Sequence, residues 1–143
     1  MRTLQFRYLD HMADTIVEAY GESLEEAFEN SALALVNIMF EVDKVVPNKS
    51  IRIEIQENDI ENLLYSWLEK ILLLMLTDEF IPLEFDASIN KEKSKIALIA
   101  NVKGENLDYR RHVYKIEVKA ITYHEMHIKQ ERDNFNIRYL VDL

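Results

Sequence analysis

The densest polar cluster in the first half of the chain is Asp10-His11-Met12-Ala13-Asp14, which lies between two apolar, strand-forming segments. Side chains at such a connection can converge on one point, where carboxylates and an imidazole could bind a cation or transfer a proton. The same residues also form ordinary turns, because Asp side chains accept hydrogen bonds from nearby backbone N–H groups. The cluster by itself therefore leaves a turn and a site open.

A second anionic pair closes the chain. Residues 135–141 alternate between apolar and polar as a strand does, and Asp142 directly precedes Leu143, whose α-carboxylate we expect at the chain end. Were this end to meet the 10–14 cluster, three or more oxygen anions would share a small volume. Such anions repel one another unless some are protonated or a hard cation balances them, and Ca²⁺ accepts six to eight oxygen ligands. Spacing alone does not bring the segments together, and the alternative is a solvated acid at a frayed terminus.

A third polar group follows residue 118. Lys119, Tyr123, His124 and Glu125 are residue types that support acid–base chemistry, but no serine nucleophile with an obvious partner lies beside them, so we assign no catalytic residue. His124 and His127 do not predict a zinc site, because residues three apart on a strand point to opposite faces and the chain has no cysteine. We interpret this segment as a strand that leads into a bend.

The composition disfavours several classes of function. The 143 residues contain 17 Lys and Arg against 26 Asp and Glu, which gives a formal net charge of −9. Strong direct RNA binding and attachment to an anionic membrane are disfavoured, since both require clustered cations. We interpret the short basic run 110–112 as a solvated loop. The absence of cysteine excludes disulfides and thiol nucleophiles, and two glycines are too few for a dinucleotide- or phosphate-binding loop.

No segment predicts export or membrane insertion. The first residues lack the apolar stretch of a secretory signal, and the longest aliphatic run, 71–76, is far too short to span a bilayer. No low-complexity linker or internal repeat divides the chain. We therefore expect a single domain over residues 1–143, located in the cytoplasm and without a membrane partner.

The first elements must position the 10–14 cluster. Residues 4–8 and 15–20 predict two strands on either side of it. Ser23 and Glu26 then form a capping box, in which the hydroxyl accepts an early helical N–H and the carboxylate reaches back to the cap. A helix with one apolar face follows.

The rest of the chain continues with one more helix and several strands. Residues 51–55 alternate as a strand, and Asn58 with Glu61 can cap a second helix that is apolar enough to be buried on most sides. After Pro82 the pattern predicts strands at 83–89, 96–102, 114–122, 126–130 and 135–141. The order predicts an α+β fold with a largely antiparallel or mixed sheet packed against two helices.

These segments together resemble the archease family. The family motif Asp-His-Thr-Ala-Asp is matched by residues 10–14, where Met12 replaces Thr. Its Gly-x-Ser-Leu-Glu-Glu-Ala-Phe and Val-Lys-Ala-x-Thr-Tyr-His-x-Met motifs are matched by 21–28 and 118–126. Further matches are Asp-Glu-Phe-Ile-Pro at 78–82 and the Val-Asp-Leu ending at 141–143. The resemblance thus runs from end to end of the chain.

The resemblance implies a small, chaperone-like α/β protein that assists the RtcB type of tRNA-splicing RNA ligase. It implies that the chain promotes guanylylation of the ligase and its multiple turnover without being a ligase or another enzyme. It also implies a divalent metal ion, calcium by expectation, held by Asp14, Asp142 and a main-chain oxygen of Leu143. Lys119 matches a family lysine that could contact the ligase or its nucleotide, while Met12 removes a hydroxyl from the motif. Other candidates for a functional role are Asp10, His11, Tyr123 and His124.

Two functions from other classes stay open at this point. A divalent-metal-dependent phosphatase or phosphodiesterase would hold its ion with Asp10, Asp14 and Asp142 and use His11 or His124 as the base. A general chaperone or interaction module would use the apolar second helix, although that stripe is typical of a core.

Overall fold

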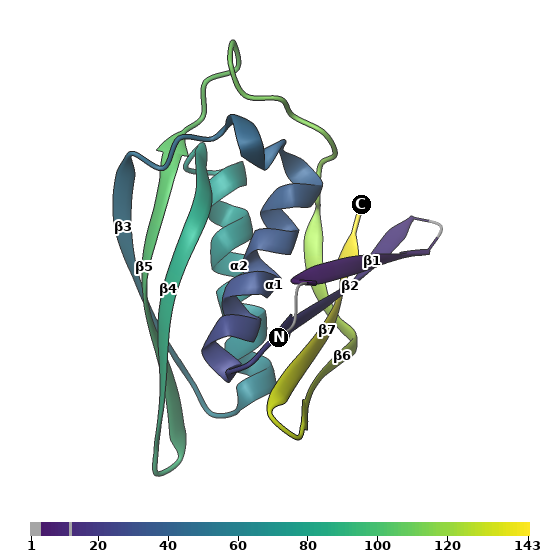
Figure 1. The fold of residues 1–143 in the computed structure, drawn as a ribbon, viewed down its shortest axis with the longest axis vertical. Coiled ribbons are helices and arrows are strands. Elements are labelled where there is room, and N and C mark those ends of the chain that lie inside the picture. The colour runs from purple at the N-terminus through teal and green to yellow at the C-terminus, as the bar shows by residue number, and fades with distance from the viewer. Residues whose placement is uncertain (1–3, 12) are drawn as a thin grey trace.

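A computed structural model describes residues 4–11 and 13–143, with the side chains of Asp10 and His11 left outside the description. Predictions that concern Met12 or these two side chains therefore lie outside the described residues. Two helices lie between two antiparallel sheets, so that the molecule has three layers (Figure 1). The α+β class predicted from the sequence is confirmed, with the strands in two sheets rather than in one sheet wrapped against the helices.

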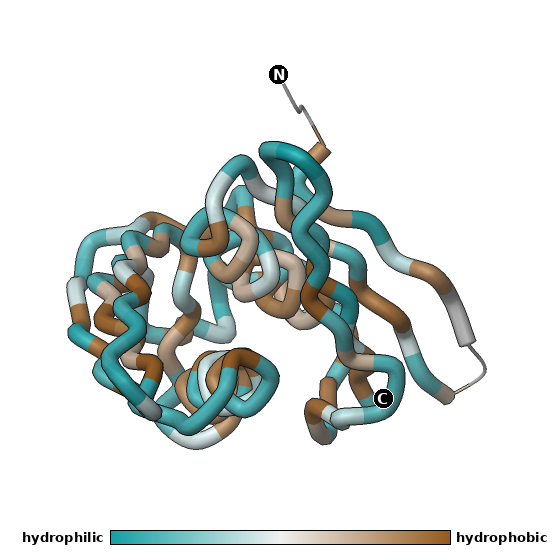
Figure 2. Tube along the Cα trace, turned by 90° about the horizontal axis from the view of Figure 1, so that it is seen from below, coloured by the Kyte–Doolittle hydropathy of each residue, from teal (hydrophilic) through white to brown (hydrophobic). Residues whose placement is uncertain are grey.

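The strands of each sheet are antiparallel, and apolar and polar residues alternate along them (Figure 2). The four-stranded sheet, of order β1-β2-β7-β6, contains β1 (Phe6–His11), β2 (Asp14–Gly21), β6 (Ala120–Glu131) and β7 (Asn134–Asp142). The three-stranded sheet, of order β3-β5-β4, contains β3 (Lys49–Glu57), β4 (Phe80–Glu92) and β5 (Lys95–Asn106). The helices are α1 (Leu24–Met39) and α2 (Ile60–Leu76), and a short 3₁₀ turn covers Val42–Lys44. Within the described residues no helix is long and apolar enough to cross a membrane.

Each helix begins at a side-chain cap. Ser23 Oγ accepts the backbone N–H of Glu26 at 3.0 Å, as the capping box predicts. The cap of α2 is Asp59 rather than the predicted Asn58, and its Oδ1 accepts the backbone N–H of Asn62 at 2.8 Å. A carboxylate suits this position because its charge also interacts favourably with the positive end of the helix dipole.

The core lies around the helix pair. Trp67 of α2 is fully buried, and its Nε1–H donates to the backbone oxygen of Phe28 in α1 at 2.9 Å. Tyr139 of β7 is also fully buried, and its O–H donates to the backbone oxygen of Ser31 at 2.8 Å. Truncation of a buried aromatic ring to Ala typically costs about 3–5 kcal/mol. These two rings therefore hold the helices to each other and to the four-stranded sheet.

The connection between β5 and β6 differs from the prediction. The sequence predicts a strand over 114–122, but residues 115–119 are irregular and β6 begins only at Ala120. The connection arches over the ends of the helices from one sheet to the other (Figure 1). Its backbone bonds to α1 on the way, where the Lys115 N–H donates to the Met39 oxygen at 2.7 Å. A segment that bridges two sheets cannot continue as a strand of either, although its residues alternate.

Candidate functional site

The β1–β2 hairpin and the last residues of the chain meet at one end of the four-stranded sheet (Figure 1). Asp14 of β2 and Asp142 of β7 are direct register partners. The Leu143 N–H donates to the Ala13 oxygen at 3.1 Å, which extends the pairing by one residue on each side. The two acidic segments that spacing alone left apart are thus adjacent strands.

The register also decides which way the two carboxylates point. Residues directly opposite each other across an antiparallel pair project from the same face, and like charges there destabilise the sheet. Asp14 is half-buried and Asp142 is exposed. On the far side of Asp142 the register partner is Ala120 of β6, whose methyl group leaves space beside the acids. Two carboxylates therefore share one open corner of the sheet.

The donor set at this corner suits a hard cation but is incomplete from side chains alone. Carboxylate and backbone oxygens are the ligands that Ca²⁺ prefers, at a high coordination number and with loose geometry. Among the described residues no group of three or more His, Cys, Asp or Glu side chains could hold a metal ion. Among the described residues, further ligands for a cation between Asp14 and Asp142 would be backbone oxygens, and the backbone of Leu143 lies beside this pair through its bond to Ala13.

Lys119 lies next to this corner. Its backbone N–H donates to the Asp142 oxygen at 2.8 Å, and its side chain is exposed. It is the last residue of the connection that crosses from the other sheet, directly before β6 begins. The lysine is thus tied to the acidic pair through the backbone, while its amine remains accessible from solvent.

Two backbone neighbours of the acidic pair come from β1. His11 is the register partner of Asp14, and Asp10 is that of Thr15. Their side chains lie outside the described residues, so the predictions made for them remain predictions.

The other predicted candidates lie in an irregularity of β6. Thr122 pairs with Leu140 and His127 with Arg138, so residues 123–126 lie opposite a single residue of β7. This β-bulge joins two segments that the sequence predicts as separate strands, 114–122 and 126–130. It occurs where Glu125 adopts a positive φ of 59°.

Tyr123, in the bulge, contacts α2 and not the acidic pair. The Tyr123 ring stacks on Tyr65 of α2 with 4.2 Å between centroids, and its O–H donates to Asn62 Oδ1 at 2.6 Å. Partial burial raises the pKa of the Tyr123 phenol. His124 is exposed and lies 3.9 Å from Glu125. The structure does not assemble Lys119, Tyr123 and His124 into one acid–base group.

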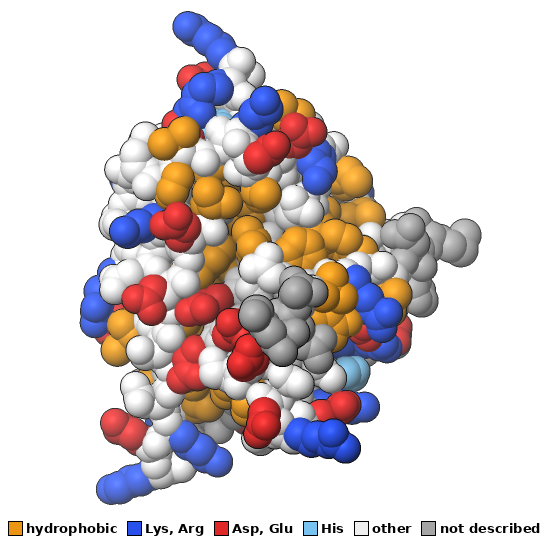
Figure 3. All heavy atoms as spheres, viewed as in Figure 1, with side chains coloured by type: hydrophobic (Ala, Val, Ile, Leu, Met, Phe, Trp, Pro, Cys, Tyr) orange, Lys and Arg blue, Asp and Glu red, His pale blue; other side chains and the backbone are white. Residues whose placement is uncertain are grey.

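An exposed apolar surface adjoins the connection that leads to Lys119. Apolar side chains gather in the upper half of the face in Figure 3, with acidic side chains below them. Large exposed apolar residues of the 107–119 connection are Tyr109, Val113, Tyr114 and Ile116. Tyr114 packs edge-on against Phe40 at the end of α1, with 5.5 Å between ring centroids. Clustered apolar surface of this kind is typical of protein–protein contacts.

The prediction of a solvated loop at 110–112 is wrong for His112. Its side chain is fully buried, with Nε2 2.9 Å from Glu105 Oε1, while Nδ1 accepts the Asp108 N–H at 2.9 Å. Arg111 pairs with the other oxygen of Glu105. Burial, followed by the charge of Arg111, lowers the pKa of His112. Glu105 belongs to β5, and no feature of the local sequence marks it as the partner of this loop.

The comparisons with known proteins fit this architecture. Residues 6–143 match the model of the Archease protein family (MTH1598/TM1083). This chain belongs to the archease family. It is 34% identical to Protein archease of Methanosarcina barkeri over 97% of this chain and 96% of the relative. Identity to Protein archease of Thermococcus gammatolerans is 42%, over 90% of this chain and 91% of the relative.

Two solved structures of the same fold are also similar. The solution structure of Methanobacterium thermoautotrophicum protein 1598 superposes with a TM-score of 0.86 at 34% identity, covering 96% of this chain and 98% of that one. A crystal structure from Thermotoga maritima, described as an archease and possible chaperone, gives a TM-score of 0.60 at 19% identity and covers 100% of this chain and 98% of that one. The second likeness concerns the fold alone.

Proposed function

We propose that this archease-family chain activates an RtcB-type tRNA-splicing RNA ligase by promoting guanylylation of the ligase and hence its multiple turnover. The chain itself performs no ligation in this proposal. The observation that carries it is the pairing of Asp14 with Asp142, because the family resemblance assigns a cation to these two positions. The exposed apolar surface of the 107–119 connection supports a protein as the partner.

We further propose that Ca²⁺ binds between these acids, with a main-chain oxygen of Leu143 as a third ligand. Two like charges opposite each other on a sheet destabilise it unless a cation balances them. When bound, the ion would supply positive charge that a phosphate of the partner's nucleotide can approach. Asp14 and Asp142 would hold that charge in place, and the exposed amine of Lys119, whose backbone N–H bonds to Asp142, would offer a second cation to the same phosphate.

The negative net charge of the chain favours a partner with a basic surface. An RNA ligase must carry a cationic surface for its substrate, and a chain with a net charge of −9 complements such a surface. The same charge limits competition for the RNA itself. The proposed role therefore combines docking through complementary charge with the placement of a cation near the ligase's nucleotide.

The hydrolase alternative finds less support. It needs a base near the proposed ion, but His124 lies in the β6 bulge with its side chain exposed. His11 lies outside the described side chains, so a chelator-sensitive phosphatase assay on the purified chain addresses this alternative directly.

The decisive experiment measures guanylylation and multiple-turnover ligation by a matched RtcB-type ligase with and without this chain. We expect acceleration by the wild-type chain and its loss in Asp14→Asn and Asp142→Asn. Asp133→Asn in the β6–β7 turn removes the same charge from an exposed position and should remain active. The proposal fails if the wild-type chain leaves both rates unchanged, or if the Asp133 variant loses as much activity as the other two.

A further inference from the structure

The solvent-facing side of the four-stranded sheet carries a second polar site, at a distance from the acidic pair. Along β2 and β7, Asp14 and Asp142 are followed on this face by Ile16 and Leu140, and then by Glu18 and Arg138. At about 3.3 Å per residue, Glu18 lies about 13 Å from Asp14 along the strand. Buried apolar side chains, Ile16 and Leu140, separate the two groups.

Glu18 organises two arginines at this position. Arg7 Nε donates to Glu18 Oε1 at 2.6 Å, and Arg138 Nε donates to Oε2 at 3.1 Å. The Tyr20 hydroxyl donates to Oε1 at 3.0 Å. Burial alone would raise the pKa of Glu18, but the hydrogen bonds from Arg138 and Arg7 outweigh it and lower that pKa to about 2. One carboxylate, ionised at neutral pH, thus binds two guanidinium groups.

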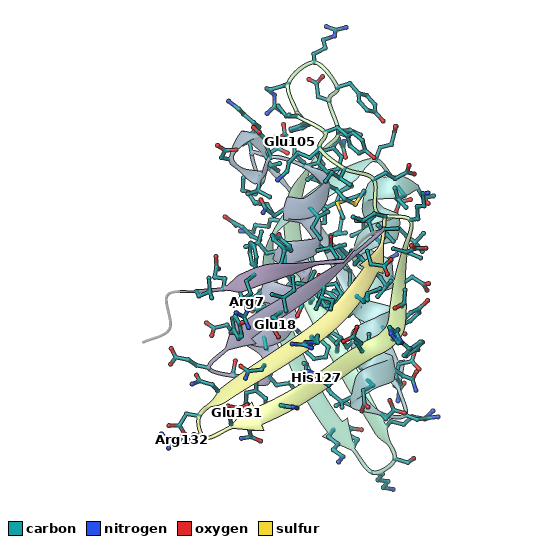
Figure 4. The ribbon with its side chains drawn as sticks, turned by 90° about the vertical axis from the view of Figure 1, so that its right-hand side faces the viewer. Arg7, Glu18, Glu105, His127, Glu131 and Arg132 are labelled. Carbon is teal, nitrogen blue, oxygen red and sulfur yellow. The ribbon has the colours of Figure 1, made fainter. Side chains whose placement is uncertain are left out.

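A hollow of about 240 Å³ opens beside this group. Figure 4 shows that Arg7, Glu18 and His127 reach it from β1, β2 and β6, and that Glu131 lies near the β6–β7 turn. Its polar lining consists of Arg7, Glu18, Tyr20, His127, Lys129, Glu131, Asn136 and Arg138. The strand register places His127 opposite Arg138 and Lys129 opposite Asn136, so residues of all four strands converge on one face.

Two polar atoms of the lining lack a partner. His127 Nδ1 and Asn136 Oδ1 are buried, and within the described part of the chain neither makes a hydrogen bond. A buried polar atom without a hydrogen bond costs about 1–3 kcal/mol, so natural proteins usually satisfy it with water or a ligand. The hollow is large enough for either. A group that enters the hollow could therefore bond to either atom.

The charged side chains that line the hollow indicate which chemical group could bind there. Three basic side chains, Arg7, Lys129 and Arg138, and two carboxylates, Glu18 and Glu131, line the hollow in a chain whose net charge is strongly negative. Glu18 pairs with both arginines, and Glu125 Oε1 also lies 3.8 Å from Arg138 Nη1, so Lys129 is the cation of this lining that remains for a ligand. Lys129 is exposed, and among the described residues its amine makes no hydrogen bond or ion pair. Guanidinium forks and a lysine from separate strands match the several oxygens of a phosphate better than a planar carboxylate.

We propose that this hollow binds a phosphate group, carried either by a small nucleotide or by a nucleic acid. The proposal is independent of the RNA-ligase role and of the cation at Asp14 and Asp142. Lys129, Arg138 and Arg7 contact the anionic oxygens, His127 donates from Nδ1 when that nitrogen is protonated, and Asn136 accepts from a protonated phosphate oxygen or a neighbouring hydroxyl. Glu18 acts as a positioning residue for both arginines.

The test is a titration of the full chain with inorganic phosphate at constant ionic strength, followed by NMR of the His imidazole and Arg Nε–H signals. We expect saturable shifts at His127 and Arg138 and a rise in the pKa of His127, because a bound anion stabilises the imidazolium. Lys129→Gln should weaken binding about tenfold, as expected for one charge-assisted hydrogen bond. The matched control is Lys91→Gln on β4, which removes the same charge from the other sheet and should bind as the wild type does.

Two further ligands distinguish the sources of the phosphate. GMP and a short 5′-phosphorylated oligoribonucleotide are titrated into the wild type and the Lys129 variant. If the chain binds both ligands with equal affinity, the ligand of the hollow is a small nucleotide. If it binds the oligonucleotide more tightly, with the same dependence on Lys129, the ligand is a nucleic acid. The proposal is overturned if none of the three ligands shifts the His127 and Arg138 signals, or if the Lys91 variant weakens binding as much as the Lys129 variant. Water then fills the hollow.

Discussion

Asp14 and Asp142 face each other directly across β2 and β7, although one lies near the start of the chain and the other next to its last residue. The arrangement depends on the sheet order β1-β2-β7-β6, which inserts the final strand beside the first hairpin. A pair of like charges in direct register costs stability unless something balances it. A cation bound between the two carboxylates would remove this repulsion.

Neutralising either acid should therefore affect the stability of the fold differently with and without calcium. In EDTA we expect Asp14→Asn and Asp142→Asn to leave the free energy of unfolding unchanged or to raise it by up to about 1 kcal/mol, because the repulsion is relieved. Added Ca²⁺ should raise the Tm of the wild type and not that of the two variants, since only binding to the native state shifts the midpoint. Thermal unfolding in both buffers measures this, with Asp133→Asn as the control. A calcium-dependent Tm that survives in both variants contradicts the assigned ligands.

Lys119 should affect the partner and not the fold. Its side chain is exposed and its structural contact is made by the backbone N–H, so Lys119→Ala should change the free energy of unfolding by less than about 0.5 kcal/mol. Calcium binding should also persist. Stimulation of ligase guanylylation should fall about tenfold if the amine contacts a phosphate of the nucleotide. Lys91→Ala serves as the control. Full stimulation by the Lys119 variant would exclude this contact.

The sequence predicts the structural features that depend on residues close together along the chain. The capping box at Ser23, the two helical faces and the alternation of the strands all follow from residues within one or two turns of each other. The acids of the candidate corner could be named for the same reason, since residue type and position mark them. Their adjacency could not be derived from spacing, because the pairing of β2 with β7 is a long-range choice made by the whole core.

The errors arise where distant contacts override a local pattern. Residues 115–119 alternate like a strand, yet they cross between the sheets and bond to the end of α1. The β6 bulge turns Tyr123 onto Tyr65 of α2, a contact that no strand periodicity contains. His112 is buried by Glu105 of another element. The sequence predicts no role for Glu18, because its two arginine partners come from two other strands. Apart from Glu105, which lies seven residues before His112, each of these partners comes from a more distant segment of the chain.

His112 should make stability depend on pH near neutrality. Burial lowers the pKa of His112 in the folded state, so folding favours the neutral ring. The stability that His112 contributes is therefore fully present above 6.5, the pKa of this group in the unfolded chain. As the pH falls through and below 6.5, the unfolded chain takes up the proton first and the contribution is lost. Protonation of Nδ1 would also break the bond from the Asp108 N–H.

Replacement of this ring checks the argument. His112→Ala should cost about 2–3 kcal/mol in the free energy of unfolding at pH 8, because Glu105 and the Asp108 N–H lose a buried partner. The difference from the wild type should shrink at pH 5.5. Urea unfolding at both values measures it, and His124→Ala, whose side chain is exposed, provides the control. A cost that is the same at both pH values contradicts the proposed protonation state.

Glu18 should produce a separate dependence at acid pH. Its pKa is about 2 in the folded state against 4.5 in the reference state, because the hydrogen bonds from Arg138 and Arg7 outweigh the opposing effect of burial. A carboxylate with a lowered pKa stabilises the fold fully above pH 4.5, and this contribution disappears as the pH falls from 4.5 through 2. A shift of this size corresponds to at most about 3 kcal/mol.

Glu18→Gln tests this window because it removes the charge and keeps the shape. We expect the variant to unfold at a lower urea concentration than the wild type at pH 7. This gap between the two urea midpoints should narrow steadily between pH 4.5 and 2.5. Glu92→Gln, at the exposed end of β4, should show no such gap. Because Glu18 orients Arg7 and Arg138, the variant should also bind inorganic phosphate more weakly at pH 7. A gap that persists undiminished at pH 2.5 would mean that packing, and not the carboxylate charge, gives Glu18 its structural role.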